Sequence, residues 1–256
     1  MDPSVASVLA FAVIFAAAGA WELRRPQSLP GQGAARRWRV NIGLFALSSG
    51  TMVLFAAVSA AVLPVWYSAA NAGAPPATGW HSIAIFLALD ATYYGLHRVL
   101  HMVGVLWRFH AVHHTDLELD VSSALRHHPG EALLTGAVAG AIAPLLGATA
   151  AEISGFAALG FAVQVIAHAN IALPPRLVRI LERFIVTPDF HRRPHGRDAE
   201  FYNSNFGHIL TLWDRVFRTA SPIGRAGPSD YGVDLFLKPS DQGLGSVLRQ
   251  PFRNPR

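Results

Sequence analysis

Five long apolar stretches constrain the fold of this chain more than any other feature of its sequence. A helix that crosses a bilayer needs about 20 mostly apolar residues. Such stretches cover residues 5–21, 41–65, 82–100, 132–151 and 153–173. Charged residues make up only 14% of the chain, whereas about 25% is usual in soluble domains. The sequence predicts an all-α integral membrane protein, a helical bundle of four to five spans in one domain, residues 1–256.

Two of these stretches leave alternatives open. Residues 5–21 could form a cleaved signal peptide, but they lack a positively charged beginning and follow Met-Asp-Pro, which favours a retained span. Glu152 is the only charge between the last two stretches. These two stretches therefore form either a tight helical hairpin or a pair of half-spans.

The distribution of Lys and Arg predicts the orientation in the membrane. If the loop after the first span is cytoplasmic, all 21 Lys and Arg lie on the cytoplasmic side, where such residues collect. Residues 66–81, on the other side, contain none. Residues 174–225 then form a cytoplasmic helical cap, and 226–256 form a loop-rich tail. A short chain without a retrieval signal favours the inner membrane of a bacterium.

The histidines fall where the positive charges fall. Of twelve histidines, only His81 lies on the opposite side, where it is expected to be a plain interfacial residue. His97 and His101 are four positions apart at the end of the third span, so a helix places both on one face. His191 and His195 repeat this spacing after the membrane region. Ionisable groups near membrane depth are costly, which favours a functional role.

Nine histidines are predicted to be metal ligands, since imidazole suits Zn, Cu, Fe and Ni. They are His97, His101, His110, His113, His114, His128, His168, His191 and His195. A structural zinc ion takes four ligands, so one ion cannot use nine. Two ions that share them would keep open positions, and iron with open positions is the usual setting for oxygen activation. The chain has no cysteine, which excludes thiolate ligands.

Three further residues are candidates for orienting the ligands without touching metal. Asp90, in the middle of a span, could hold a ligating histidine or form a buried hydrogen bond to a neighbouring tyrosine or helix. Asn170 could orient a ligand or cap a helix. His127 is expected to be exposed or next to a ligand, and His128 has the alternative of a turn residue before Pro129. His208, Trp213 and Asp214 are expected to make structural contacts in the cap.

Six segments follow one another between about residues 80 and 220; five contain the predicted ligands, and the sixth is characterised by Asn, Trp and Asp. They are residues 90–101, 107–114, 126–131, 168–171, 187–195 and 203–215. Their order and spacing resemble the fatty acid hydroxylase superfamily, close to its sterol desaturase branch. One difference stands out. Pro194 occupies the place where the family usually has the first of two adjacent histidines, which removes an expected ligand and a backbone donor.

The resemblance implies a membrane di-iron oxygenase that hydroxylates or desaturates a lipid of fatty acyl, sterol or isoprenoid type. The nine histidines would hold two Fe ions, with Zn as an alternative in isolated protein, and O2 would be the co-substrate. The sequence contains no dinucleotide fingerprint and no haem-attachment motif. Electrons are therefore expected from an external electron-transfer protein, a reductase.

Other functions fit the sequence less well. An intramembrane zinc hydrolase would use His-Glu-x-x-His, which does not occur. A transport-type metal-binding protein would need polar residues along a path across the spans. The outer halves of the spans are almost purely apolar. A non-catalytic relative, disabled by Pro194, is a further alternative. The sequence contains no basic patch interleaved with aromatic residues, the pattern that would indicate nucleic-acid binding. The sequence does not indicate an oligomeric state.

Overall fold

The computed structural model describes residues 3–29, 31, 33–62, 79–197, 201–223, 228 and 230–253. Throughout these residues the regular secondary structure is helical, with isolated β-bridges and no strand. The predicted all-α class is therefore confirmed. The Arg-free loop predicted at 66–81 lies mostly outside the described residues.

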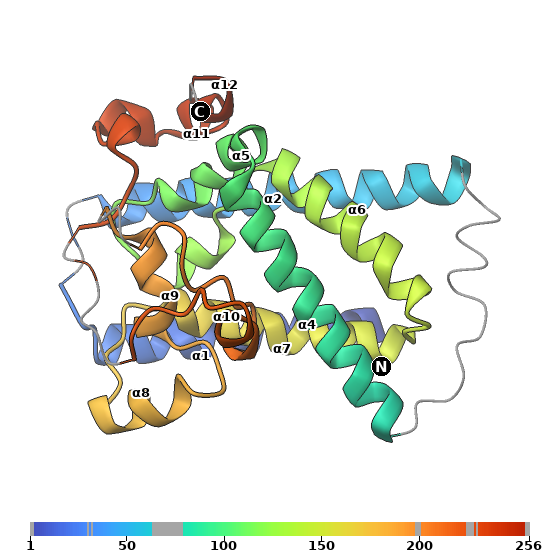
Figure 1. The fold of residues 1–256 in the computed structure, drawn as a ribbon. Coiled ribbons are helices and arrows are strands. Elements are labelled where there is room, and N and C mark those ends of the chain that lie inside the picture. The colour runs from blue at the N-terminus through green and yellow to red at the C-terminus, as the bar shows by residue number, and fades with distance from the viewer. Residues whose placement is uncertain are drawn as a thin grey trace.

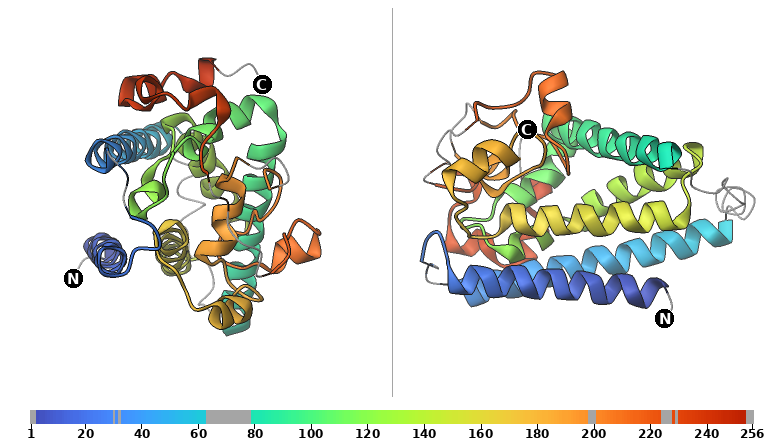
Figure 2. Two further views of the ribbon diagram at one scale, coloured as in Figure 1. Left: turned by 90° about the vertical axis from the view of Figure 1, so that its left-hand side faces the viewer. Right: turned by 90° about the horizontal axis from the view of Figure 1, so that it is seen from below.

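Five long helices form the bundle (Figures 1 and 2). They are α1 (Pro3–Arg24), α2 (Ala34–Val62), α4 (Gly79–Met102), α6 (Pro129–Leu145) and α7 (Ala150–His168). Helix α2 packs on α6, α1 packs on α7, and α4 contacts both α6 and α7. Each helix contains the greater part of one predicted span, so the apolar stretches located the helices correctly.

Three helical segments are long and apolar enough to cross a membrane: Ala34–Ser59, Gly79–Met102 and Ala150–His168, while Pro129–Leu145 is apolar but shorter. Their outward surfaces are apolar as well. Val53 and Leu54 on α2 are 71% and 65% exposed, respectively. A contiguous apolar surface of this kind marks a membrane or protein contact, and on helices of this length it indicates a membrane protein.

The turn between the last two predicted spans lies earlier in the structure than the sequence predicted. Helix α6 stops at Leu145 and α7 begins at Ala150, with Gly147 in the left-handed region (φ 67°) at the turn. The Thr149 hydroxyl accepts from the Glu152 amide, and the Glu152 carboxylate accepts from the Thr149 amide. This capping box fixes the start of α7. The connection is thus a short turn, after which α6 packs mainly on α2 and α7 mainly on α1.

Shorter helices gather at one end of the bundle, which Figure 2 shows face-on in its left panel. They are α5 (Gly104–His114), η1 (Val121–Leu125), α8 (Pro175–Leu181), α9 (Pro188–His195) and α10 (Leu212–Val216). The tail, predicted as loop-rich, contains η2 (Asp234–Phe236), η3 (Pro239–Gln242), α11 (Leu244–Val247) and α12 (Gln250–Arg253). Phe236 and Val247 are fully buried, so packing of a few apolar side chains orders these short turns.

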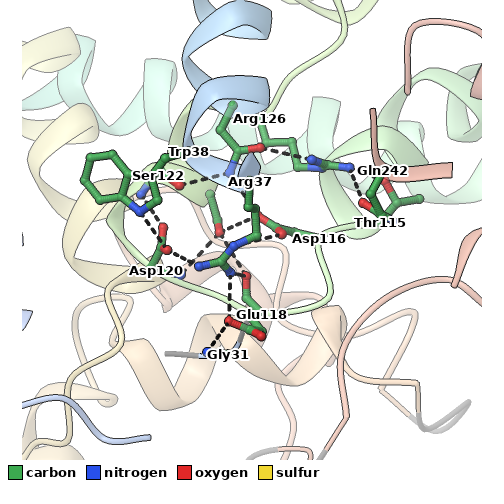
Figure 3. A network of polar contacts seen from close by, with 12 residues as sticks. Gly31, Arg37, Trp38, Thr115, Asp116, Glu118, Asp120, Ser122, Arg126 and Gln242 are labelled. Atoms are coloured by element: carbon green, nitrogen blue, oxygen red, sulfur yellow. Dashed lines mark hydrogen bonds and ion pairs between the residues drawn. The ribbon is translucent and has the colours of Figure 1, made fainter. Parts of the chain in front are cut away.

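A buried polar network holds these short elements against α2 (Figure 3). The Arg126 guanidinium is fully buried and donates to the carbonyl of Val112 and to the side chains of Asn41 and Thr115, each at 3.0 Å. It also donates to Gln242 of η3 at 2.9 Å. One arginine therefore joins α2, α5 and the tail beside the histidine-rich segments.

Candidate metal centre

Eight of the nine predicted ligands come together in two groups. Group A consists of His97, His101, His110 and His114. Group B consists of His113, His168, His191 and His195. Within each group, one nitrogen or other ligand atom per residue lies within 4.8 Å of the others.

Four helices supply these side chains, and one of them supplies both groups. Helix α4 contributes to group A, α7 and α9 contribute to group B, and α5 contributes to both. Consecutive residues of a helix point about 100° apart, because a turn takes 3.6 residues. His113 and His114 of α5 therefore enter different groups and place the groups side by side.

The Nε2 atoms converge in both groups. The Nε2–Nε2 distances are 3.2 Å for His110–His114, 3.1 Å for His113–His168, 3.0 Å for His168–His191 and 3.2 Å for His191–His195. The Nε2 atoms of His97 and His101 are buried without a hydrogen-bond partner among the described residues.

In four of these histidines the Nδ1 atom points outward to a main-chain carbonyl. The Nδ1–O distances are 3.0 Å for His97–Phe206, 3.2 Å for His113–Arg126, 3.1 Å for His114–Pro194 and 2.7 Å for His168–Gln164. A carbonyl can only accept, so each of these Nδ1 atoms carries the proton and Nε2 is a bare lone pair. Converging lone pairs cannot bond to each other, whereas a metal cation satisfies them all. The donor set therefore fits two metal ions.

Burial keeps the histidines outside the spans neutral. Desolvation, with a smaller contribution from neighbouring histidines, lowers the pKa of His113, His114, His191 and His195 well below the usual value. Neutral imidazole is the form that binds metal. These rings are consequently ready to act as ligands at neutral pH.

Glu131 is a site residue that sequence reasoning missed. Its buried Oε1 accepts from Nδ1 of His110 at 2.8 Å and from Nδ1 of His127 at 3.1 Å. A carboxylate in this position fixes the ring orientation and raises the basicity of a ligating imidazole. The available signal was an acidic residue in the first turn of the helix that begins at Pro129.

His127 and His128 have different surroundings. The His127 ring stacks on the ring of His113, with centroids 4.4 Å apart, and therefore lies next to a predicted ligand. His128 lies outside both groups. Its Nδ1 accepts from the Gly130 amide at 2.9 Å and caps α6, and its Nε2 donates to the Leu248 carbonyl at 3.2 Å. Both ring nitrogens of His128 are thus engaged, which matches the alternative of a turn residue.

Among the described residues, Asp90 and Asn170 bond to connecting segments and to α10, and not to the histidine rings of either group. The Asp90 carboxylate accepts from the amides of Ile209 and Leu210 and from Trp213 Nε1 at 2.9–3.2 Å. The Asn170 side chain bonds the main chain of Ser28 after α1. For Asp90 the structure therefore shows the alternative of buried hydrogen bonds, and both residues hold connecting segments in place.

Pro194 does not reduce the number of histidines in either group below four. It is buried in α9, and its carbonyl is the acceptor for Nδ1 of His114. Each group has four histidines without a ligand from position 194. The residue that interrupts the expected motif thus orients a histidine of group A through its main chain.

A cavity of about 500 Å³ opens onto both groups. His97 and His110 of group A line its floor together with His113 and His191 of group B. Its walls come from α2, α4, α6 and α7 and are mainly apolar. They include Phe45, Met52, Leu96, Leu100 and Phe161. The cavity suits an apolar chain that reaches the histidines.

Comparison with known proteins places this architecture in a family. Residues 82–219 match the fatty acid hydroxylase family. Similar curated proteins include alkylglycerol monooxygenase of Danio rerio (27% identical, over 72% of this chain and 42% of the relative) and of Xenopus tropicalis (29%, over 72% and 42%). Ornithine lipid hydroxylase OlsE of Rhizobium tropici is 28% identical over 70% of this chain and 56% of the relative.

The chain spans about half the length of these relatives. No solved structure matches it. The family match covers more than half of the chain and includes all eight histidines of groups A and B. The resemblance predicted from the sequence is thereby confirmed, and the chain belongs to the fatty acid hydroxylase family.

Proposed function

We propose that this protein is a membrane lipid hydroxylase that uses O2 and two iron ions, one held by group A and one by group B. The observation that carries the proposal is the apolar cavity whose floor contains histidines of both groups. The names of its relatives, alkylglycerol monooxygenase and ornithine lipid hydroxylase, support oxygen chemistry on a lipid. Its apolar walls disfavour a transport-type metal-binding protein, which would need a polar path.

The residues of the chain have three tasks in this function. Main-chain carbonyls hold the Nδ1 protons outward so that Nε2 faces the ion. Glu131 orients His110. The cavity walls orient the lipid and exclude water. Iron with open positions supplies oxygen activation when bound, and an external electron-transfer protein supplies the electrons.

We further propose that the histidine-rich end faces the cytoplasm of a bacterium, with the bundle in the inner membrane. The arginines support this orientation, because Arg24, Arg25, Arg36, Arg37 and Arg39 all lie between or at the ends of α1 and α2 at that end. The lipid would then reach the cavity sideways from the bilayer.

The test replaces one histidine of each group and measures metal and product. His101→Ala removes a ligand of group A, and His168→Ala removes a ligand of group B. We expect two iron ions per wild-type chain, loss of at least one ion in each variant, and a fall in lipid oxidation of a hundredfold or more. Lipid mass spectrometry of the cells distinguishes hydroxylation, a gain of one oxygen, from desaturation, a loss of two hydrogens.

The matched control is His128→Ala. This change removes a helix cap and costs about 1 kcal/mol of stability, but the iron content should stay at the wild-type value. Wild-type protein without stoichiometric metal, or host lipids that do not change when the gene is removed, would contradict the proposed function.

A further inference from the structure

Tyr93 on α4 and His208 between α9 and α10 form a polar pair in the cavity wall that the metal groups do not use. Their rings stack with centroids 4.5 Å apart and an interplanar angle of 22°. Both residues line the cavity. In the described part of the chain, neither the Tyr93 hydroxyl nor the His208 ring nitrogens have a hydrogen-bond partner. Polar groups in apolar surroundings are costly when they are unpaired.

The loop that carries His208 is fixed on both sides of that residue. Asp214 accepts from the amides of Phe206 and Gly207 at 2.8 and 2.7 Å. Asp90 accepts from the amides of Ile209 and Leu210. The His208 carbonyl itself accepts from Gln164 Nε2 at 2.6 Å. Two carboxylates and an amide thus hold the imidazole at the cavity in advance of any ligand.

Helix α7 has a gap for this ring at Gly160. A Cβ atom added at Gly160 would lie 2.6 Å from His208 Nε2, which is too close for a carbon atom. The Phe156 ring flanks the pair, 5.4 Å from Tyr93 and 5.8 Å from His208 between centroids. Glycine at position 160 is therefore what allows His208 to lie against α7.

The pair lies close to the candidate metal centre. Tyr93 precedes His97 of group A by four positions on α4, so both side chains share one face. Four residues of helix rise about 6 Å. A group bound by the pair would therefore lie about one helical turn from the histidines.

We propose that Tyr93 and His208 form a subsite that binds an uncharged polar group of the lipid substrate, a hydroxyl or an amide, a few bonds from the carbon that is oxidised. This rests on the proposed function and specifies its substrate class. A phenol and a neutral imidazole can each donate and accept one hydrogen bond, which suits groups that do both. Burial lowers the pKa of His208 to about 4, which keeps the ring neutral, and the apolar walls penalise a charged ligand.

The test measures equilibrium binding of two radiolabelled probes, 1-hexadecanol and heptadecane, to the full chain in nanodiscs. The probes have the same number of heavy atoms and differ in the hydroxyl group. We expect wild-type protein to prefer the alcohol by about tenfold. Tyr93→Phe removes only a hydroxyl, and His208→Phe keeps a flat ring. Each should reduce that preference about three- to tenfold, the usual effect of one hydrogen bond, with heptadecane binding unchanged.

Two glycines of α7 supply a matched pair of variants. Gly160→Ala should displace the His208 ring and reduce the preference as His208→Phe does. An alanine Cβ at Gly155 meets nothing within 4 Å, so Gly155→Ala should keep the wild-type preference.

Equal binding of both probes by the wild type, or a full preference in Tyr93→Phe and His208→Phe, would overturn the subsite. Retained heptadecane binding shows that a variant is folded. If a larger substitution fails to fold, the result for Tyr93→Phe, the smallest change, decides the test. An alcohol preference that the variants lose, in a protein that oxidises no lipid, would support the subsite and reject the proposed function.

Discussion

A Glu131→Gln protein is expected to bind iron ten- to a hundredfold more weakly than the wild type, the usual cost of losing a group that orients a metal ligand. The carboxylate accepts from Nδ1 of His110 and of His127. Glutamine has nearly the same shape and keeps an acceptor oxygen but carries no charge, so His110 loses the negative charge that increases its basicity. The measurement is iron affinity by competition with a chelator, together with lipid oxidation at saturating iron.

Glu118→Gln is the matched control, since it makes the same chemical change in a side chain that is 43% exposed. Glu118 bonds the Gly31 amide and lies near Arg37 (Figure 3). Its replacement should leave iron affinity at the wild-type value. If Glu131→Gln bound iron as tightly as Glu118→Gln, the assigned role of Glu131 would be wrong.

The second large effect is expected in stability. Glu182→Gln should lower the free energy of unfolding by about 3–5 kcal/mol, as when one partner of a buried ion pair is removed. Glu182 pairs with Arg193 at 3.1 Å, and both side chains are fully buried. Glu182 also accepts from Thr187, the residue that caps α9. Because Arg193 lies between His191 and His195 on α9, group B should lose iron before group A as denaturant rises.

An exposed ion pair provides the comparison for this result. Arg197 and Asp234 are 2.7 Å apart, but their side chains are 40% and 71% exposed. Asp234→Asn should therefore cost less than about 1 kcal/mol. Unfolding in detergent, followed by circular dichroism, gives both values. Similar losses for Glu182→Gln and Asp234→Asn would mean that burial does not strengthen the Glu182 pair.

The sequence predicted the helices and most histidines of the candidate site, but not their grouping. Helical spacing places His97 with His101, and His191 with His195, and the structure agrees. It cannot show that His113 and His114 separate, because that depends on where α4, α7 and α9 pack around α5. The Nδ1 acceptors are mainly main-chain carbonyls, which no side-chain pattern encodes. Because the sequence does not show these main-chain contacts, His128 could not be distinguished from the histidines that were predicted to bind metal.

Helix ends were the other weak point of the sequence prediction. A hydropathy window averages transfer free energy over many residues, so it merged the turn at Gly147 with the neighbouring spans. Hydrogen bonds between Thr149 and Glu152 determine where α7 starts. In the tail, Pro and Gly content indicated loop, whereas Phe236 and Val247 are buried and order short helices. Local capping and packing, which composition does not report, decide these boundaries.

The two groups of histidines differ in how far apart their members lie along the chain. Group A lies on the consecutive helices α4 and α5, so it can assemble as soon as both have been synthesised. Group B joins His113 to His168, 55 positions later, and then to α9. An ion bound there would join segments that lie far apart along the chain, and its binding free energy would add to the stability of the folded state. In a chain without cysteine, metal binding at group B would thus connect early and late segments that no disulfide can join.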